Sequence, residues 1–74
     1  MFPIEGTHGG VIAKLDINFT SIRKDGSGEY VYAQRGNMPV STWRNLTYGS
    51  RVKFKIYFNF YGPTASDVQI DGLL

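Results

Sequence analysis

The chain has 74 residues and a mass of 8.3 kDa, which allows one domain with one small hydrophobic core. It contains no cysteine, so no disulfide framework or thiolate metal site supplements this core, and a reducing cytoplasm is the expected location. No secretion signal or membrane-length apolar run occurs, so we expect no membrane partner. The net charge is +2, and aromatic residues make up 15% of the chain, more than such a core needs. Some rings are therefore expected on the surface.

Strand-forming residues and nine glycines dominate the chain, and no window keeps a helical spacing of apolar residues without a Gly or Pro. The composition predicts an all-β class and a single domain over 1–74. Residues 1–8 are expected to form a flexible N-terminal extension. A first strand is predicted over 10–17, where imperfect alternation indicates a bulge.

A second strand is predicted over 19–24 and a third over 29–34, joined by the turn Asp25-Gly26-Ser27-Gly28. Successive residues of a strand point to opposite faces. If Ile22 and Val31 point into the core, the outward side chains of this pair of strands include Phe19, Tyr30 and Tyr32.

Residues 35–49 show no period and are expected to form a long functional loop that carries Trp43. The next strand, 50–58, has the clearest alternation, with one apolar and one basic face. Its apolar face, expected in the core, comprises Val52, Phe54, Ile56 and Phe58, and its basic face includes Arg51, Lys53 and Lys55. After Gly62-Pro63 a last strand is predicted over 64–70. Five short strands and one long loop indicate a small barrel.

Two motifs in the second half resemble a cold-shock domain: Leu46-x-x-Gly49-x-x-Val52-x-Phe54 and Gly62-Pro63-x-Ala65-x-x-Val68. The first half is similar in order and length, and the resemblance covers roughly 9–70. It implies a five-stranded antiparallel OB-type barrel without a cofactor. In that family, exposed aromatic side chains stack the bases of single-stranded RNA or DNA with low sequence specificity, and an RNA chaperone role follows from such binding.

The resemblance also implies site residues. The positions that match base-stacking aromatics of the family are Phe19, Tyr30, Tyr32 and Trp43. Basic residues near them in sequence are the expected phosphate contacts, namely Lys14, Arg23, Lys24, Arg35 and Arg44. The chain departs from the family pattern where other aromatic residues are common, at Ser21, Ala33 and in the first strand. About half of the family's stacking surface is missing as a result.

Catalysis has little support, because His8 is the only histidine and no nucleophile or acid accompanies it at a useful spacing. We therefore expect no enzyme, no catalytic residue, no metal site and no cofactor. The lost aromatic residues leave a second interpretation open, in which a degenerate barrel binds a protein partner through its tyrosine-rich face or through the tail 70–74. A homodimer through a strand edge, and an engineered or recombined barrel without an evolved function, remain further alternatives.

Overall fold

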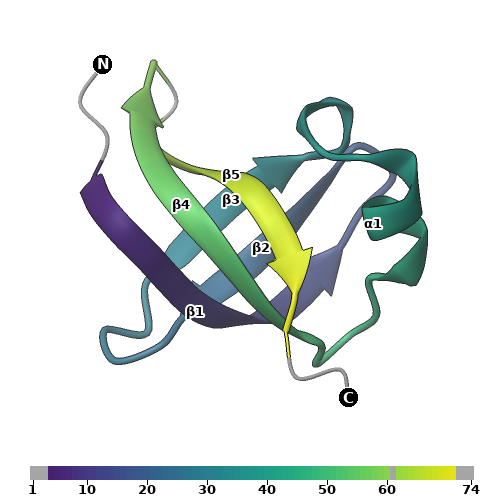
Figure 1. Cartoon of the computed structure of the whole chain (residues 1–74), viewed down its shortest axis with the longest axis horizontal. Helices are drawn as coiled ribbons and strands as arrows, with labels where there is room; N and C mark the ends of the chain where they lie inside the picture. The colour runs from purple at the N-terminus through teal and green to yellow at the C-terminus, as the bar shows by residue number, and fades with distance from the viewer. Residues whose placement is uncertain (1–3, 61, 72–74) are drawn as a thin grey trace.

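Five β-strands make up most of the computed structural model, which describes residues 4–60 and 62–71 (Figure 1). The strands are β1 (Ile4–Leu15), β2 (Phe19–Lys24), β3 (Tyr30–Gln34), β4 (Arg51–Asn59) and β5 (Gly62–Ile70). Between β3 and β4 the chain forms a 3-10 turn, η1 (Arg35–Asn37), and a short helix, α1 (Val40–Asn45). The all-β class expected from composition is confirmed.

The strands close into a barrel in the order β1-β2-β3-β5-β4, with β4 pairing back onto β1. Neighbouring strands are antiparallel except β3 and β5, which are parallel and meet where Tyr32 pairs with Thr64. The sheet is therefore mixed, and the expectation of a fully antiparallel barrel is wrong at this one pair. The reason lies in the connection through α1, which carries the chain across the barrel end. The hairpin of β4 and β5 then returns beside β3 in the same direction.

The core lies inside the barrel and is built mainly from alternating strand positions, with two residues from the segment between β3 and β4. Its buried apolar residues are Ile12, Ile22, Val31, Ala33, Met38, Leu46, Val52, Phe54, Ile56, Ala65 and Val68. The predicted inward positions of Val31, Phe54 and Ile56 are confirmed, since each is at most 3% exposed. Phe58 was expected in the core but is 45% exposed. Alternation alone cannot show where a strand passes beyond the core.

β1 begins six residues earlier than predicted. Ile4 pairs with Ile56 and His8 with Phe54 on β4, so residues 4–8 belong to the barrel and not to a flexible extension. Residues 1–3 of the expected extension lie outside the described residues. The predicted bulge is confirmed by a register shift between Ile12 and Lys14.

Gly10 lets β1 pass close to β2. A Cβ atom at this buried position would lie 2.6 Å from Cγ2 of Ile22 and 2.7 Å from the carbonyl oxygen of Arg23. Both distances are shorter than any van der Waals contact, and the second is to backbone that cannot move independently. The absence of a side chain at Gly10 is therefore a requirement of this barrel.

The segment expected as a loop over 35–49 contains η1 and α1, which cover one end of the barrel (Figure 1). Met38 and Leu46 flank the helix and are both buried in the core. The helix starts after Pro39, whose carbonyl oxygen accepts a hydrogen bond from the Trp43 backbone N–H at 3.0 Å. Within residues 4–60 and 62–71, no helix has the length and apolar content that crossing a bilayer requires.

Candidate functional site

The outer face of β2 and β3 carries aromatic side chains because both strands alternate between core and solvent. On β3, Val31 is 2% exposed, whereas Tyr30 and Tyr32 are 53% and 48% exposed. On β2, Ile22 is fully buried and Phe19 is half-buried. The predicted outward orientation of both tyrosines is confirmed, and contact with Tyr32 places Phe19 on the same face.

Phe19 and Tyr32 form an edge-to-face pair. Their ring centroids are 5.9 Å apart and their planes meet at 66°. The strand register explains the contact: Phe19 lies opposite Gln34 and Ser21 opposite Tyr32, so the two rings are diagonal neighbours on one face. Such a pair fixes two aromatic surfaces relative to each other before any ligand arrives.

Trp43 and Arg35 form a second pair next to the first. The Arg35 guanidinium carbon lies 5.7 Å from the centroid of the Trp43 ring, within the range of a cation–π contact. Arg35 Nη1 also donates a hydrogen bond to the carbonyl oxygen of Ile17 at 3.4 Å. The half-buried indole packs against the core. Trp43 therefore packs against the core with part of its ring and contacts Arg35 at the surface.

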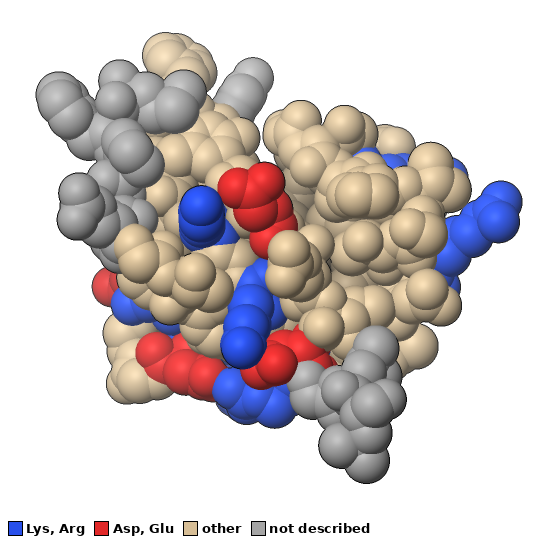
Figure 2. Space-filling view, viewed as in Figure 1, with Lys and Arg blue, Asp and Glu red and all other residues tan. Residues whose placement is uncertain are grey.

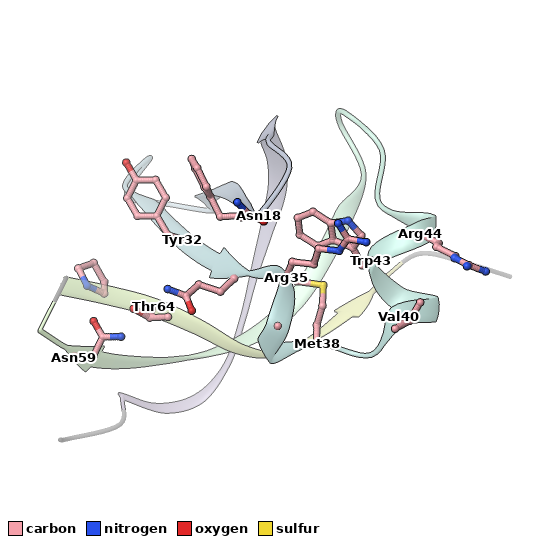
Figure 3. Close-up of a pocket in the computed structure, with 13 residues that line it drawn as sticks. Asn18, Tyr32, Arg35, Met38, Val40, Trp43, Arg44, Asn59 and Thr64 are labelled. Carbon is pink, nitrogen blue, oxygen red and sulfur yellow. The ribbon is translucent and has the colours of Figure 1, made fainter.

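These two pairs line one open groove with a volume of about 1010 Å³, which we call the aromatic groove (Figure 3). Its described lining residues are Asn18, Phe19, Tyr32, Gln34, Arg35, Gly36, Met38, Val40, Trp43, Arg44, Asn59, Pro63 and Thr64. It extends from the hairpin of β4 and β5, where Asn59 and Thr64 lie, to α1, where Val40 and Arg44 lie (Figure 3). Both charged side chains in this lining are arginines, so the groove suits an anionic ligand that presents flat apolar surfaces.

The other predicted site residues lie outside the aromatic groove. Tyr30 shares the outer face of β3 with Tyr32, two residues away. Arg23 pairs directly with Tyr30, and Lys14 pairs with Ser21, the partner of Tyr32, so two exposed cations flank the tyrosines across the sheet. Lys24 is half-buried at the end of β2. Among the predicted phosphate contacts, only Arg35 and Arg44 reach the aromatic groove.

The basic row of β4 belongs to a different face, formed by β1, β4 and β5, on which positive and negative side chains alternate (Figure 2). Arg51 forms an ion pair with Asp25, and Lys53 Nζ lies 3.6 Å from Asp71 Oδ1. Acidic partners thus compensate two of the three cations of this row. This face offers no continuous positive surface to a phosphate backbone.

His8 occupies a strand position and not a mobile terminus. Its ring centroid lies 6.2 Å from that of Phe54, and its buried Nε2 atom has no hydrogen-bond partner among residues 4–60 and 62–71. In the part of the chain that the structure describes, no three His, Cys, Asp or Glu side chains gather closely enough to hold a metal ion. Ile70, the first residue of the tail expected to bind a partner, packs against the core, and residues 72–74 lie outside the described residues.

Several groove residues were not predicted. Asn18, Gln34, Asn59 and Thr64 supply neutral hydrogen-bonding groups, and they come from four separate segments. Only the strand register and the return of β5 beside β3 bring them together. No local sequence pattern signals such a lining.

Neither models of known protein families nor curated protein sequences match this chain. What the aromatic groove binds is therefore inferred from its own geometry and charge.

Proposed function

We propose that this chain is a cold-shock-like, OB-type barrel that binds single-stranded RNA or DNA in the aromatic groove with low sequence specificity. Bases stack on Phe19, Tyr32 and the Trp43–Arg35 pair, and Tyr30 adds an outer stacking surface. Arg35, Arg44, Arg23 and Lys14 neutralise phosphates. A strand held through its bases cannot pair with itself, so the same binding acts as an RNA chaperone without a cofactor.

The fold supports this proposal. The strand order β1-β2-β3-β5-β4 and a helix between β3 and β4 agree with an OB-type barrel, a fold that binds oligonucleotides on the face of its second and third strands. The aromatic groove includes residues of β2 and β3. Fold similarity alone does not assign a function, so the proposal depends on the side chains of this face.

The observation that carries the proposal is the convergence of Phe19, Tyr32 and Trp43 on one groove whose charged lining residues are Arg35 and Arg44. Each base stacked on an aromatic ring contributes about 1–3 kcal/mol, whatever its identity. Three to four such surfaces at about 2 kcal/mol each correspond to dissociation constants from about 1 to tens of micromolar. A guanidinium plane over Trp43 is itself a surface on which bases stack in RNA complexes.

Trp43 is the only tryptophan, so its fluorescence reports directly on the aromatic groove. Titration with an oligothymidine or a mixed-sequence RNA is expected to quench it. Affinity is expected to fall as salt rises, with a slope of about −0.7 in log K against log salt for each phosphate contact. Absence of both quenching and retention at low salt refutes nucleic-acid binding and favours a protein partner for this face.

Arg44→Gln and Lys55→Gln form a matched pair, because each removes one positive charge from an exposed side chain and only Arg44 lines the aromatic groove. Arg44→Gln is expected to weaken binding and reduce the salt slope by about 0.7, whereas Lys55→Gln leaves both near the wild-type values. Equal effects of the two substitutions indicate attraction by net charge alone, and not a site in the groove.

A further inference from the structure

The hairpin of β4 and β5 projects beyond the barrel core (Figure 1). Two phenylalanines of this hairpin are exposed. On β4, Ile56 is the last buried residue at 3% exposure, whereas Phe58 is 45% exposed and Phe60, in the turn after the strand, is 94% exposed. The tip of this hairpin therefore presents two large apolar side chains to solvent, and exposed apolar surface of this kind is typical of binding sites.

This hairpin tip, defined here as Phe58 and Phe60, adjoins the end of the aromatic groove farthest from α1. Phe58 pairs directly with Pro63, which lines the groove, and Phe60 follows Asn59, another lining residue. A ligand that runs along the groove from α1 therefore reaches the hairpin tip when it leaves past Asn59 and Pro63.

The tip differs from the groove in charge. Residues 56–66 contain no Lys, Arg, Asp or Glu, so this part of the hairpin supplies rings without phosphate contacts. Any base can stack on a phenylalanine ring. The salt dependence of affinity, in contrast, arises from cationic side chains that displace counterions from the phosphates. A contribution of the tip to binding is therefore expected to be insensitive to salt.

We propose that the hairpin tip extends the binding track, and that Phe60, with Phe58, stacks bases of the same strand after it leaves the aromatic groove. This inference depends on the proposed function and lengthens its site. The occupant is the continuation of a single-stranded nucleic acid, because the tip is continuous with a groove that suits such a ligand.

The test compares oligothymidines of about four and about nine nucleotides, within the site sizes known for OB folds. Wild type is expected to bind the longer oligonucleotide more tightly. Phe60→Ala is expected to weaken binding of the longer one by about fivefold or more and to leave the shorter one unchanged. Phe60→Tyr keeps the ring and is expected to bind like wild type. Tyr48→Ala is the matched control, since Tyr48 is 77% exposed and lies outside the groove lining.

Salt dependence separates the tip from the groove. On the longer oligonucleotide, Phe60→Ala is expected to keep the wild-type salt slope while losing affinity, whereas Arg44→Gln reduces the slope by about 0.7. Phe58→Ala, checked for an unchanged thermal melt, supplies a second variant on the same hairpin.

Four outcomes overturn the inference, and only the last of them also overturns the proposed function. If Phe60→Ala binds the longer oligonucleotide as tightly as wild type, the tip is not part of the track, while the proposed function stands. If Phe60→Ala weakens both lengths equally, the ring acts within the groove and not beyond it. If Phe60→Ala alters only the concentration-dependent sedimentation of the free protein, a second copy of the chain covers the tip. Failure of wild type to bind either oligonucleotide overturns the proposed function as well.

Discussion

Val31 and Tyr32 are adjacent on β3 but face opposite sides of the barrel wall, so they separate stability from binding. Val31 is 2% exposed in the core, and Tyr32 is 48% exposed in the aromatic groove. We expect Val31→Ala to destabilise the fold while binding survives in the folded fraction. Tyr32→Ala is expected to weaken binding while the fold survives.

The magnitudes follow from what each substitution removes. Val31→Ala deletes two buried carbon groups at about 0.8 kcal/mol each and leaves a cavity, for a loss of about 2–3 kcal/mol. A chain of this length is stable by about 4–11 kcal/mol, so the variant folds but melts about 10–20 °C lower. Tyr32→Ala loses chiefly the edge contact with Phe19, worth about 0.5–1.5 kcal/mol, and lowers the melting temperature by roughly 2–10 °C.

Thermal melting followed by circular dichroism, combined with the Trp43 titration, measures both effects in each variant. Tyr32→Ala is expected to bind about 5- to 150-fold more weakly than wild type, the equivalent of one stacked base. Tyr32→Phe keeps the ring and serves as its control. The reasoning is refuted if Tyr32→Ala melts as low as Val31→Ala, or if it binds with wild-type affinity.

Two further predictions concern backbone positions and share one measurement, the free energy of unfolding in urea. Gly10→Ala places a methyl group against the Arg23 carbonyl and is expected to cost at least about 1–3 kcal/mol, whereas Gly36→Ala, with open space around its Cβ, changes stability by less than about 1 kcal/mol. Similar losses at both glycines contradict the close approach of β1 and β2. Asp67 has a φ of 52°, a left-handed conformation that costs a non-glycine residue about 1–2 kcal/mol. Asp67→Gly is therefore expected to raise stability by about 0.5–1 kcal/mol, and Asp67→Val to lower it by about 1–2 kcal/mol; the opposite order shows that the strain lies elsewhere.

Elements with local signals were predictable. β2 has the bounds expected from the sequence, 19–24, and β4 shifts by one residue from the expected 50–58. In β4, apolar and polar residues alternate over most of the strand. β2 is followed directly by turn residues that mark its end. Neighbouring residues in the sequence therefore specify both strands.

Elements that depend on distant partners were not predictable. The first part of β1 contains Gly6, Gly9 and Gly10 and shows no alternation, yet it forms a strand because β4 pairs with it. α1 has six residues, too few for a helical period to appear. The parallel pairing of β3 with β5 was also missed, because it places Tyr32 beside a residue 32 positions away in the chain.

The candidate site shows the same division. Alternation and the aromatic excess predicted that Tyr30 and Tyr32 face outward, which requires only local sequence. The amide side chains line the groove only because the strands and α1 come together there in the folded chain. The same packing explains why, of the five predicted phosphate contacts, only Arg35 and Arg44 line the groove. Specific contacts at this site are therefore a property of the tertiary fold.

Trp43 connects the stability of the barrel with the proposed site. A helix of six residues is not stable alone in water, so α1 persists because Met38, Leu46 and Trp43 pack against the barrel. The indole ring of Trp43 covers the core, and the same ring lines the aromatic groove. The Arg35 guanidinium lies over this ring. The proposed stacking of a base there requires α1 to be packed, so we expect binding and closure of the barrel end to stabilise each other by linkage. Removal of the Trp43 ring therefore affects folding and binding together, whereas Tyr32, on a strand paired on both sides, separates the two.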